Sequence, residues 1–393
     1  MRILVIGAGV GGISIARGLL RDGHDVTVFE RRPDVQAGGG AVTIWSNGAT
    51  VLRQLGVDMD GAGQALSTVR VMTSAGHGLA TLDLSAIANR MGEQVRQVPR
   101  RILLERLLEG FPAECILCNA HAVGVVRECD GARIEFADGS HADGDLVIGA
   151  DGLHSMVRGV VGADRAVPTG WCSWQGLTAL PDGIDRHVAF VVIGEHGNLG
   201  LWPAGSEVQW WFDLPWSPDF VRPERPIDML RSNFTGWTEP TDRVLAMLTD
   251  DDLAHSPYPH FRHPIPPSGH GALTLVGDAA HTMPPTLAQG TNQALLDTMV
   301  LCKALSDVRR EAHGDLTGAL RRYEKTRRRR AAAVSRVASL QVSHGEAVLR
   351  PAAMLSDRFM TWALSTFLRS VSHRRMADDI NRDLAASTTC RQR

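Results

Sequence analysis

The first thirty residues constrain the fold of this chain more than any other stretch. A short apolar run from Ile3 to Ile6 predicts a buried strand, and apolar residues from Ile13 to Leu20 follow a helical spacing. Between them lies Gly7 to Gly12, with the sequence GAGVGG, which matches the pattern G-x-G-x-x-G. A second predicted strand, Asp25 to Phe29, ends at Glu30. Strand, glycine turn, helix, strand and acid in this order predict a dinucleotide-binding βαβ unit.

Each glycine of this turn has a physical role in such a unit. Gly7 permits a tight turn, Gly9 lets a pyrophosphate approach the backbone, and Gly12 lets helix and strand pack closely. The helix N-terminus offers free N–H groups and a positive dipole end to the phosphates. Glu30 can accept hydrogen bonds from ribose hydroxyls and disfavours a 2′-phosphate, so FAD or NAD is expected rather than NADP. A glycine-rich turn without a ligand is the alternative.

Composition excludes several classes of function. The length of 393 residues favours two or three domains, and the net charge of −2 gives no indication of nucleic acid or an acidic membrane surface as a partner. No run approaches the roughly 18 apolar residues of a membrane span. The first strand begins at the N-terminus, so no signal peptide and a cytoplasmic location are expected. Cys115 and Cys118 have C-x-x-C spacing without a second pair or a histidine cluster, so we expect buried structural thiols and no metal site.

Two further predicted strands also end in loops that combine glycine with an acid. Asp145 to Ile148 leads into the loop around Asp151, and Leu273 to Val276 leads into Gly277 and Asp278. A helix is expected from about Gln293. Because the carboxyl ends of parallel strands meet at one edge of a sheet, a ligand is expected where these loops gather.

The motifs together resemble those of the class A flavoprotein monooxygenases, the para-hydroxybenzoate hydroxylase-like family of single-component FAD enzymes. That family combines the glycine fingerprint and its acid with R-x-x-L, G-A-D-G-x-x-S-x-x-R and G-D-A-A-H-x-x-x-P-x-x-G-Q-G-x-N-x-A-x-x-D. The later motifs stand here as Arg100 to Leu103, Gly149 to Arg158 and Gly277 to Asp297. Their order and spacing match over roughly residues 1–345, whereas the first motif alone is shared by many unrelated proteins.

The resemblance implies an FAD site. In it Glu30 would hold the adenosine ribose, and Arg100 would lie along the pyrophosphate and ribityl chain. The loop of Asp151 would support the FAD, and Asp278 would bind a ribityl hydroxyl. Backbone N–H groups near Gly290 and Asn292 would stabilise negative charge at the flavin N1–C2=O edge, as the helix dipole also favours. The expected cofactor-binding residues are Gly7, Gly9, Gly12, Glu30, Arg31, Arg100, Asp151, Asp278, Pro285, Gly290, Thr291 and Asn292. Ala288 departs from the family, which usually has glycine there, and we expect it to restrict the backbone or the movement of the flavin.

Residues 166–264 predict an antiparallel sheet rich in tryptophan. Alternation along one strand places Trp210 and Phe212 on one face and Trp211 on the other. The tryptophans are either the core of the sheet or the lining of an aromatic substrate pocket, and the resemblance implies that one or two line the pocket. The candidate pocket residues are Trp45, Gln175, Trp202, Trp210, Trp211, Pro284 and Thr286.

The predicted fold class is α/β, with a Rossmann-like FAD-binding domain, an inserted antiparallel-sheet substrate domain and C-terminal helices. The FAD-binding domain is expected to comprise residues 1–70, 98–165 and 265–345, the substrate domain residues 71–97 and 166–264, and the helical segment residues 346–393. The run Arg327 to Arg330 is expected to lie on a solvated surface. The amphipathic stretch Met354 to Val371 is expected to pack on the core or on a partner subunit, with a lid or a membrane-surface contact as alternatives.

By resemblance, NAD(P)H reduces FAD, O₂ adds at C4a of the flavin, and the hydroperoxide hydroxylates an aromatic or polycyclic small molecule. No second G-x-G-x-x-G follows a strand, so NAD(P)H is expected to dock transiently. His187, His281 and Gln175 are weak candidates for a base, and no catalytic residue is assigned. The alternatives are an FAD-dependent dehydrogenase or oxidase, or an FAD-fold binding protein without oxygen transfer; a halogenase is disfavoured because the W-x-W-x-I-P stretch is missing. A monomer or homodimer is expected.

Overall fold

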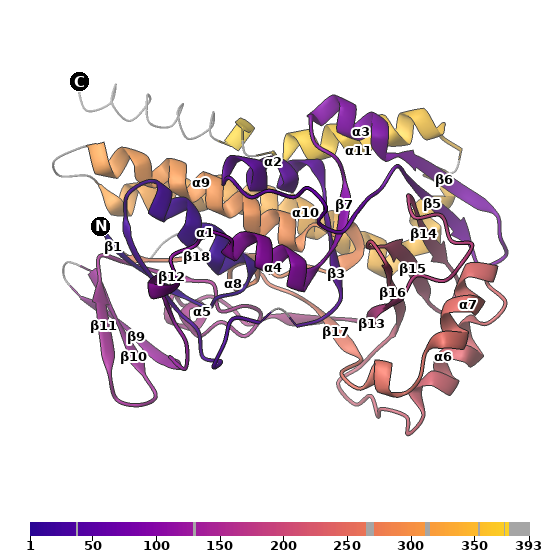
Figure 1. The fold of residues 1–393 in the computed structure, drawn as a ribbon, viewed down its shortest axis with the longest axis horizontal. Coiled ribbons are helices and arrows are strands. Elements are labelled where there is room, and N and C mark those ends of the chain that lie inside the picture. The colour runs from indigo at the N-terminus through magenta and orange to yellow at the C-terminus, as the bar shows by residue number, and fades with distance from the viewer. Residues whose placement is uncertain are drawn as a thin grey trace.

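The computed structural model describes residues 1–36, 38–128, 131–264, 271–310, 315–352, 354–372 and 374–376. Within these residues the strands form four sheets. A parallel sheet lies towards one end of the molecule and a seven-stranded sheet towards the other, with long helices along the axis between them (Figure 1). No described helix is long and apolar enough to cross a membrane.

The parallel sheet carries the N-terminal βαβ unit. Its strands stand in the order β18 (Leu273–Leu275), β12 (Leu146–Gly149), β1 (Arg2–Ile6), β2 (Asp25–Phe29) and β8 (Ile116–Leu117). All neighbouring pairs are parallel. Because both faces of this sheet are covered, its strands are apolar almost throughout, as the sequence predicts.

Helices pack on one face of the parallel sheet and the strands of a small sheet on the other. The helices that share its core are α1 (Val10–Arg21), α2 (Ser46–Gln54), α4 (Arg100–Leu108) and α9 (Gly290–Arg310). The antiparallel strands β9 (Ala122–Glu128), β10 (Gly131–Phe136) and β11 (His141–Gly144) complete the second layer. A three-stranded sheet of β3 (Ala41–Ile44), β7 (Arg96–Pro99) and β4 (Gln64–Ala65) leads towards the second half of the molecule.

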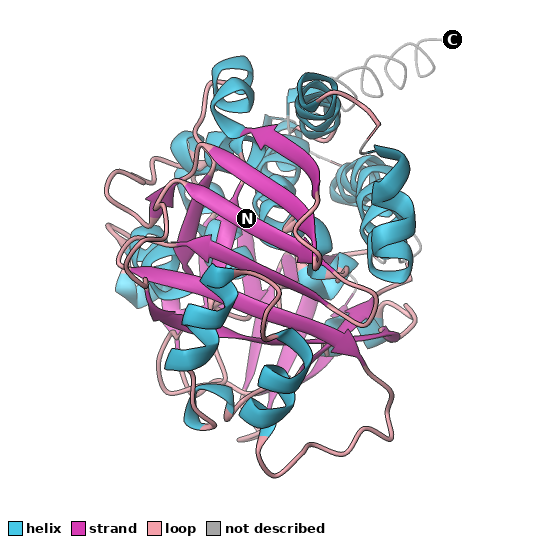
Figure 2. Cartoon of the chain, turned by 90° about the vertical axis from the view of Figure 1, so that its right-hand side faces the viewer, coloured by secondary structure: helices cyan, strands magenta, loops and turns pink. Residues whose placement is uncertain are grey.

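The seven-stranded sheet confirms the antiparallel pattern predicted for the middle of the chain. Its order is β17 (Tyr258–Arg262), β13 (Val167–Ala179), β16 (Glu207–Pro215), β15 (Asn198–Pro203), β14 (Val188–Ile193), β5 (Thr68–Thr73) and β6 (Gly78–Asp83). Only β14 and β5 pair in parallel within it. Helices α6 (Pro226–Phe234) and α7 (Glu239–Met247) cover one face (Figure 2).

The remaining elements connect and brace these sheets. They are α3 (Leu84–Met91), η1 (Ala113–Cys115), α5 (Met156–Val160), η2 (Asp251–Leu253), α8 (Asp278–His281), η3 (Pro285–Leu287), α10 (Leu316–Ala352) and α11 (Asp357–Ser370). Helix α10 continues past the boundary expected at 345/346, so that position is not a break between elements. Helix α11 packs on the core through Leu368. At its exposed start, the Asp357 carboxylate accepts a hydrogen bond from the Thr81 backbone N–H at 2.8 Å. The predicted helical segment beyond residue 376 lies outside the described residues.

Candidate functional site

The three motif-bearing loops lie side by side because their strands end in register. Ile6 at the end of β1 pairs with Gly149 of β12, and Gly149 pairs with Leu275 of β18. The first turn is tight: Gly7 has φ +104°, and a Cβ on it would stand 2.5 Å from the carbonyl oxygen of Ala150. A Cβ on Gly12 would stand 1.8 Å from the carbonyl oxygen of Gly7. Both positions therefore require glycine for the backbone to pass.

Gly9 faces open space at the N-terminus of α1. A Cβ on Gly9 would meet no atom within 4 Å, and its φ of −72° is open to any residue. Beside it the Glu30 carboxylate accepts hydrogen bonds from the backbone N–H groups of Ala8 and Arg32, each at 3.0 Å. A carboxylate accepts further bonds beyond these two, so ribose hydroxyls can still bind it. Arg31 and Arg100 are both exposed near this loop region.

The second loop is braced by its own acid. Asp151 Oδ2 accepts hydrogen bonds from the backbone N–H groups of Met156 and Val157, at 2.8 and 3.3 Å, at the start of α5. Its Oδ1 is buried without a partner. Burial raises the pKa of this carboxyl, and these hydrogen bonds together with that of Ser155 oppose the rise. Asp278, at the start of α8 in the third loop, is exposed.

The N-terminus of α9 is a second open helix end. A Cβ on Gly290 would meet no atom within 4 Å, and Nε2 of the preceding Gln289 is buried without a partner. The Asn292 side chain is fully occupied: its Oδ1 accepts from the Trp45 backbone N–H, and its Nδ2 donates to the carbonyls of Thr43 and Ala288, each at 2.9 Å. Asn292 therefore fixes the loops of the site through its side chain and leaves only its backbone for a ligand.

These features fit FAD. Two helix N-termini with open space at Gly9 and Gly290 suit a pyrophosphate and an anionic flavin edge. The unpartnered polar atoms of Asp151 and Gln289 lie buried in loops of the same site. Pro285 is exposed and Thr291 half-buried at its margin.

Ala288 adopts a left-handed conformation, with φ +49° and ψ +37°. This conformation costs an L-residue other than glycine about 1–2 kcal/mol, whereas glycine adds roughly 0.5–1 kcal/mol of unfolded-chain entropy. Ala288→Gly is therefore expected to stabilise the protein by up to about 1 kcal/mol in urea unfolding. As a control, Ala86→Gly in the exposed face of α3 should destabilise it by about 1 kcal/mol. Equal losses in both variants would contradict the strain at Ala288.

A buried ionic cluster joins the third loop to α9 and α10. Asp297 Oδ2 accepts from the Gly277 backbone N–H and contacts His281 Nε2, each at 2.7 Å, and its Oδ1 accepts from Arg327 Nε. Burial alone would raise the pKa of Asp297, but His281 and Arg327 outweigh it and lower it to about 2. The expectation that Arg327 lies on a solvated surface is wrong: its side chain is buried, and Nη2 also binds the carbonyl oxygen and Oε1 of Gln293.

One face of the seven-stranded sheet is turned towards these loops. Trp202 contacts Trp45 edge-on, with ring centroids 6.4 Å apart, and Trp211 at 6.0 Å. On the same face Gln209 Oε1 accepts a hydrogen bond from the Ala41 backbone N–H. Strand alternation also puts Gln175, which pairs with Trp211, on this face. We call this surface of β13, β14, β15 and β16 the inner face.

Trp210 lies on the opposite face, and the structure contradicts its place among the pocket candidates. It is fully buried, its ring contacts that of Phe212, and it shares a core cluster with residues of α6 and α7. Thr286 donates its hydroxyl hydrogen to the Ala338 carbonyl of α10 at 2.9 Å, which ties η3 to that helix. Pro284 is buried beside it.

Three polar side chains that the sequence analysis did not single out form a buried chain at the inner face. His260 Nε2 lies 2.7 Å from Ser173 Oγ, and the Ser173 hydroxyl donates to Asp213 Oδ1. Because the one hydroxyl proton goes to Asp213, His260 Nε2 carries the proton that Ser173 accepts. Polar residues at inward positions of apolar strands were the available signal, but only the strand register brings these three together.

The Asp213 carboxyl predicts a pH dependence of stability. Burial raises its pKa to about 7, against the opposing hydrogen bond from Ser173. Nearby, burial lowers the pKa of His260 to about 4 and raises that of Cys172 to about 12, so both stay neutral between pH 5 and 8. Because the folded protein favours the neutral form of the Asp213 carboxyl, this group's contribution to the free energy of unfolding is complete below the unfolded-state pKa near 4. That contribution is lost as pH rises through 7. Asp213→Asn should therefore gain stability relative to wild type between pH 5 and 8, measured by urea unfolding; a constant difference would contradict the shifted pKa.

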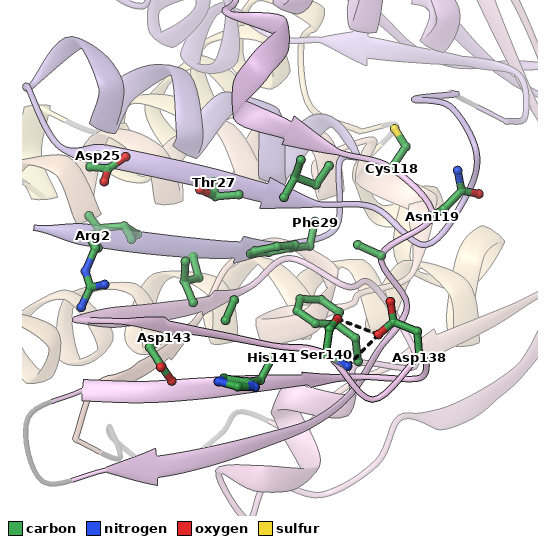
Figure 3. Close-up of a pocket in the computed structure, with 16 residues that line it drawn as sticks. Arg2, Asp25, Thr27, Phe29, Cys118, Asn119, Asp138, Ser140, His141 and Asp143 are labelled. Atoms are coloured by element: carbon green, nitrogen blue, oxygen red, sulfur yellow. Dashed lines mark hydrogen bonds between the residues drawn. The ribbon is translucent and has the colours of Figure 1, made fainter.

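A surface cleft of about 540 Å³ lies between β1, β2 and β8 on one side and β10 and β11 on the other (Figure 3). Arg2 and Asp25 stand at one end, and Cys118 and Asn119 at the other. None of the predicted site residues lines it, so this cleft is separate from the candidate site. Cys115 and Cys118 are free thiols that are only half-buried, so they are less buried than expected.

Known proteins share both the sequence and the fold. A family model described as an FAD binding domain matches residues 1–338. The chain belongs to the class A family of FAD-dependent monooxygenases. It is 29% identical over 336 residues to the aurachin C monooxygenase/isomerase of Stigmatella aurantiaca, covering 84% of this chain and 86% of the relative. It is 30% identical over 340 residues to the FAD-dependent urate hydroxylase of Klebsiella pneumoniae, covering 83% and 86%.

The crystal structure of a variant of Klebsiella pneumoniae HpxO complexed with FAD superposes on this monooxygenase-family chain with a TM-score of 0.84. The two are 25% identical, and the match covers 94% of this chain and 99% of the other. The predicted family and fold class are therefore confirmed. One of these relatives is named a monooxygenase/isomerase and another an FAD-dependent hydroxylase, and the solved structure holds FAD, which supports an enzyme with FAD as cofactor.

Proposed function

We propose that this protein is a single-component monooxygenase that uses NAD(P)H and O₂ to hydroxylate an aromatic or polycyclic small molecule. The observation that carries this proposal is the position of the open helix end at Gly290. At that helix end, the Asn292 side chain accepts a hydrogen bond from the Trp45 backbone N–H. The Trp45 ring in turn contacts the ring of Trp202 on the inner face. A flavin ring at this helix end would face an aromatic surface, which suits the binding of a flat aromatic substrate beside it.

The residues of the chain would hold the cofactor along its length. Glu30 would bind the adenosine ribose, the amides at Gly9 the pyrophosphate, and Asp278 a ribityl hydroxyl. Arg100, exposed beside Gly39, would reach the phosphates from the other side. Bound FAD supplies the redox and oxygen-activating chemistry. The backbone N–H groups at the start of α9 would stabilise the negative charge of the reduced ring.

The chain's other contribution is to exclude water and position the substrate. The half-buried Trp211, packed against the buried Trp202, offers an apolar ring on which an aromatic ring can stack. A site from which water is excluded protects reactive intermediates from hydrolysis. NAD(P)H is proposed to dock transiently, since the only G-x-G-x-x-G that follows a strand is the one that binds FAD.

The test is NAD(P)H consumption by the FAD-loaded protein against a panel of phenolic, N-heteroaromatic and polycyclic compounds, with products identified by mass. The proposal expects a compound that accelerates consumption and is itself hydroxylated. Oxidation of a compound without oxygen gain would instead favour the dehydrogenase. Bound FAD with no stimulation by any compound would favour the binding protein.

A further inference from the structure

The inner face is nearly free of positive charge. On the strands β13, β14, β15 and β16, all of whose residues the structure describes, no lysine or arginine occupies an inner-face position. The cofactor-side segments 38–48 and 277–292 also contain neither residue type. At its margin Arg101 is paired with Glu207 at 2.6 Å, and Arg100 lies exposed beside Gly39. Arg262 lies on the edge strand β17 and is exposed.

An aromatic carboxylate would have no countercharge on such a surface. A carboxylate moved out of water needs a cation or several hydrogen bonds, because an unpaired buried charge is strongly unfavourable. Asp213 makes the inner face still less favourable for an anion, since the ionised Asp213 carboxylate and the anion would be two like charges close together. The inner face therefore selects against acids.

Asp213 is arranged to accept a hydrogen bond from a ligand. The donor chain from His260 through Ser173 ends at its Oδ1, which fixes the carboxyl in place. Its Oδ2 receives no hydrogen bond from any described residue. Asp213 stands in the same cross-strand row as the half-buried Asn198, one row from Trp211 and Gln175, all on the inner face. A group held this way, beside the aromatic surface, can bind an O–H or N–H of a stacked ring.

We propose that the substrate is an uncharged fused aromatic compound whose O–H or N–H group binds Asp213, and that aromatic carboxylates are rejected. This inference rests on the proposed function and names the substrate class of the same site. The half-buried Trp211 supplies contact area for a fused ring, and Asp213 supplies its orientation.

The test compares three ligands on the same ring system: naphthol, methoxynaphthalene and hydroxynaphthoate. Their dissociation constants are measured with the FAD-loaded protein at about pH 8 from the perturbation of the flavin absorbance, without turnover. A charge-assisted hydrogen bond corresponds to roughly tenfold or more in affinity, so naphthol should bind at least about tenfold more tightly than methoxynaphthalene. Hydroxynaphthoate should bind at least about tenfold more weakly than naphthol.

Two variants separate recognition by Asp213 from general damage. In Asp213→Asn the preference for naphthol over methoxynaphthalene should fall to about threefold or less, because an amide replaces the charged acceptor. Asp219→Asn, an exposed carboxylate of the same sheet domain, should keep the wild-type preference. Both variants should retain the FAD spectrum.

The outcomes distinguish this inference from the proposed function. Tighter binding of hydroxynaphthoate, failure of all three compounds to bind, or an unchanged preference in Asp213→Asn would overturn the inference. Hydroxylation of an aromatic carboxylate would do so too, while leaving the monooxygenase intact. Selective binding of naphthol without any hydroxylation would support the inference about the face and count against the proposed function.

Discussion

Replacing Gly12 by alanine is expected to abolish FAD binding together with the native fold of the βαβ unit. The new Cβ would stand 1.8 Å from the carbonyl oxygen of Gly7, which is backbone and cannot rotate away. Helix α1 would have to move off β1, exposing part of the main core. The expected loss is several kcal/mol of unfolding free energy, on the order of the largest effects seen for point substitutions. Urea unfolding and flavin absorbance after gel filtration measure both effects.

Gly9→Ala is the matched control for Gly12→Ala, because it separates contact with the ligand from packing within the protein. Its Cβ would meet no protein atom within 4 Å, so the stability of the apoprotein should change by less than about 1 kcal/mol. The methyl group would occupy the space through which the pyrophosphate approaches, so FAD affinity should still fall by at least about tenfold. Full FAD affinity in Gly9→Ala would contradict the placement of the pyrophosphate.

The second large effect is expected at Arg327. Arg327→Met would leave the buried Asp297 carboxylate without its guanidinium partner, and breaking such a pair costs about 3–5 kcal/mol. The stabilisation carried by the lowered pKa of Asp297 is present above the unfolded-state value near 4 and is lost as pH falls through about 2. The difference from wild type should therefore be fully developed at neutral pH.

Arg328→Met provides the control for Arg327, because its side chain is exposed on the next position of the same helix. Its effect on unfolding free energy should stay within about 0.5 kcal/mol. Equal stability of the two variants in urea would show that the buried cluster does not brace α10 against the third loop.

Local patterns were sufficient for the cofactor half of the molecule. The glycine turn at Gly7, the strand ends and the helix starts each depend on residues adjacent in sequence, so the βαβ unit and the family could be predicted. Alternation also correctly separated Trp210 from Trp211. It could not say which face would be covered, because that depends on α6 and α7, which follow later in the chain.

Long-range packing determined what the sequence left open. Four consecutive arginines point to all sides of a helix, and Arg327 is the buried one only because α9 brings Asp297 against it. Asp213 lies 40 positions and His260 87 positions after Ser173 in the sequence. The three side chains meet only through the register of three strands. Such clusters are invisible to periodicity, since each member alone looks like an isolated polar residue in an apolar strand.

We expect this protein to transfer an oxygen atom from O₂ to an aromatic substrate at the FAD site. The most direct measurement is mass spectrometry of the product formed by the FAD-loaded protein, NAD(P)H and a stimulating aromatic compound under isotopically labelled O₂. We expect one labelled oxygen atom in the product and none when label is supplied in water. A product that carries oxygen from water, or none at all, would contradict the account.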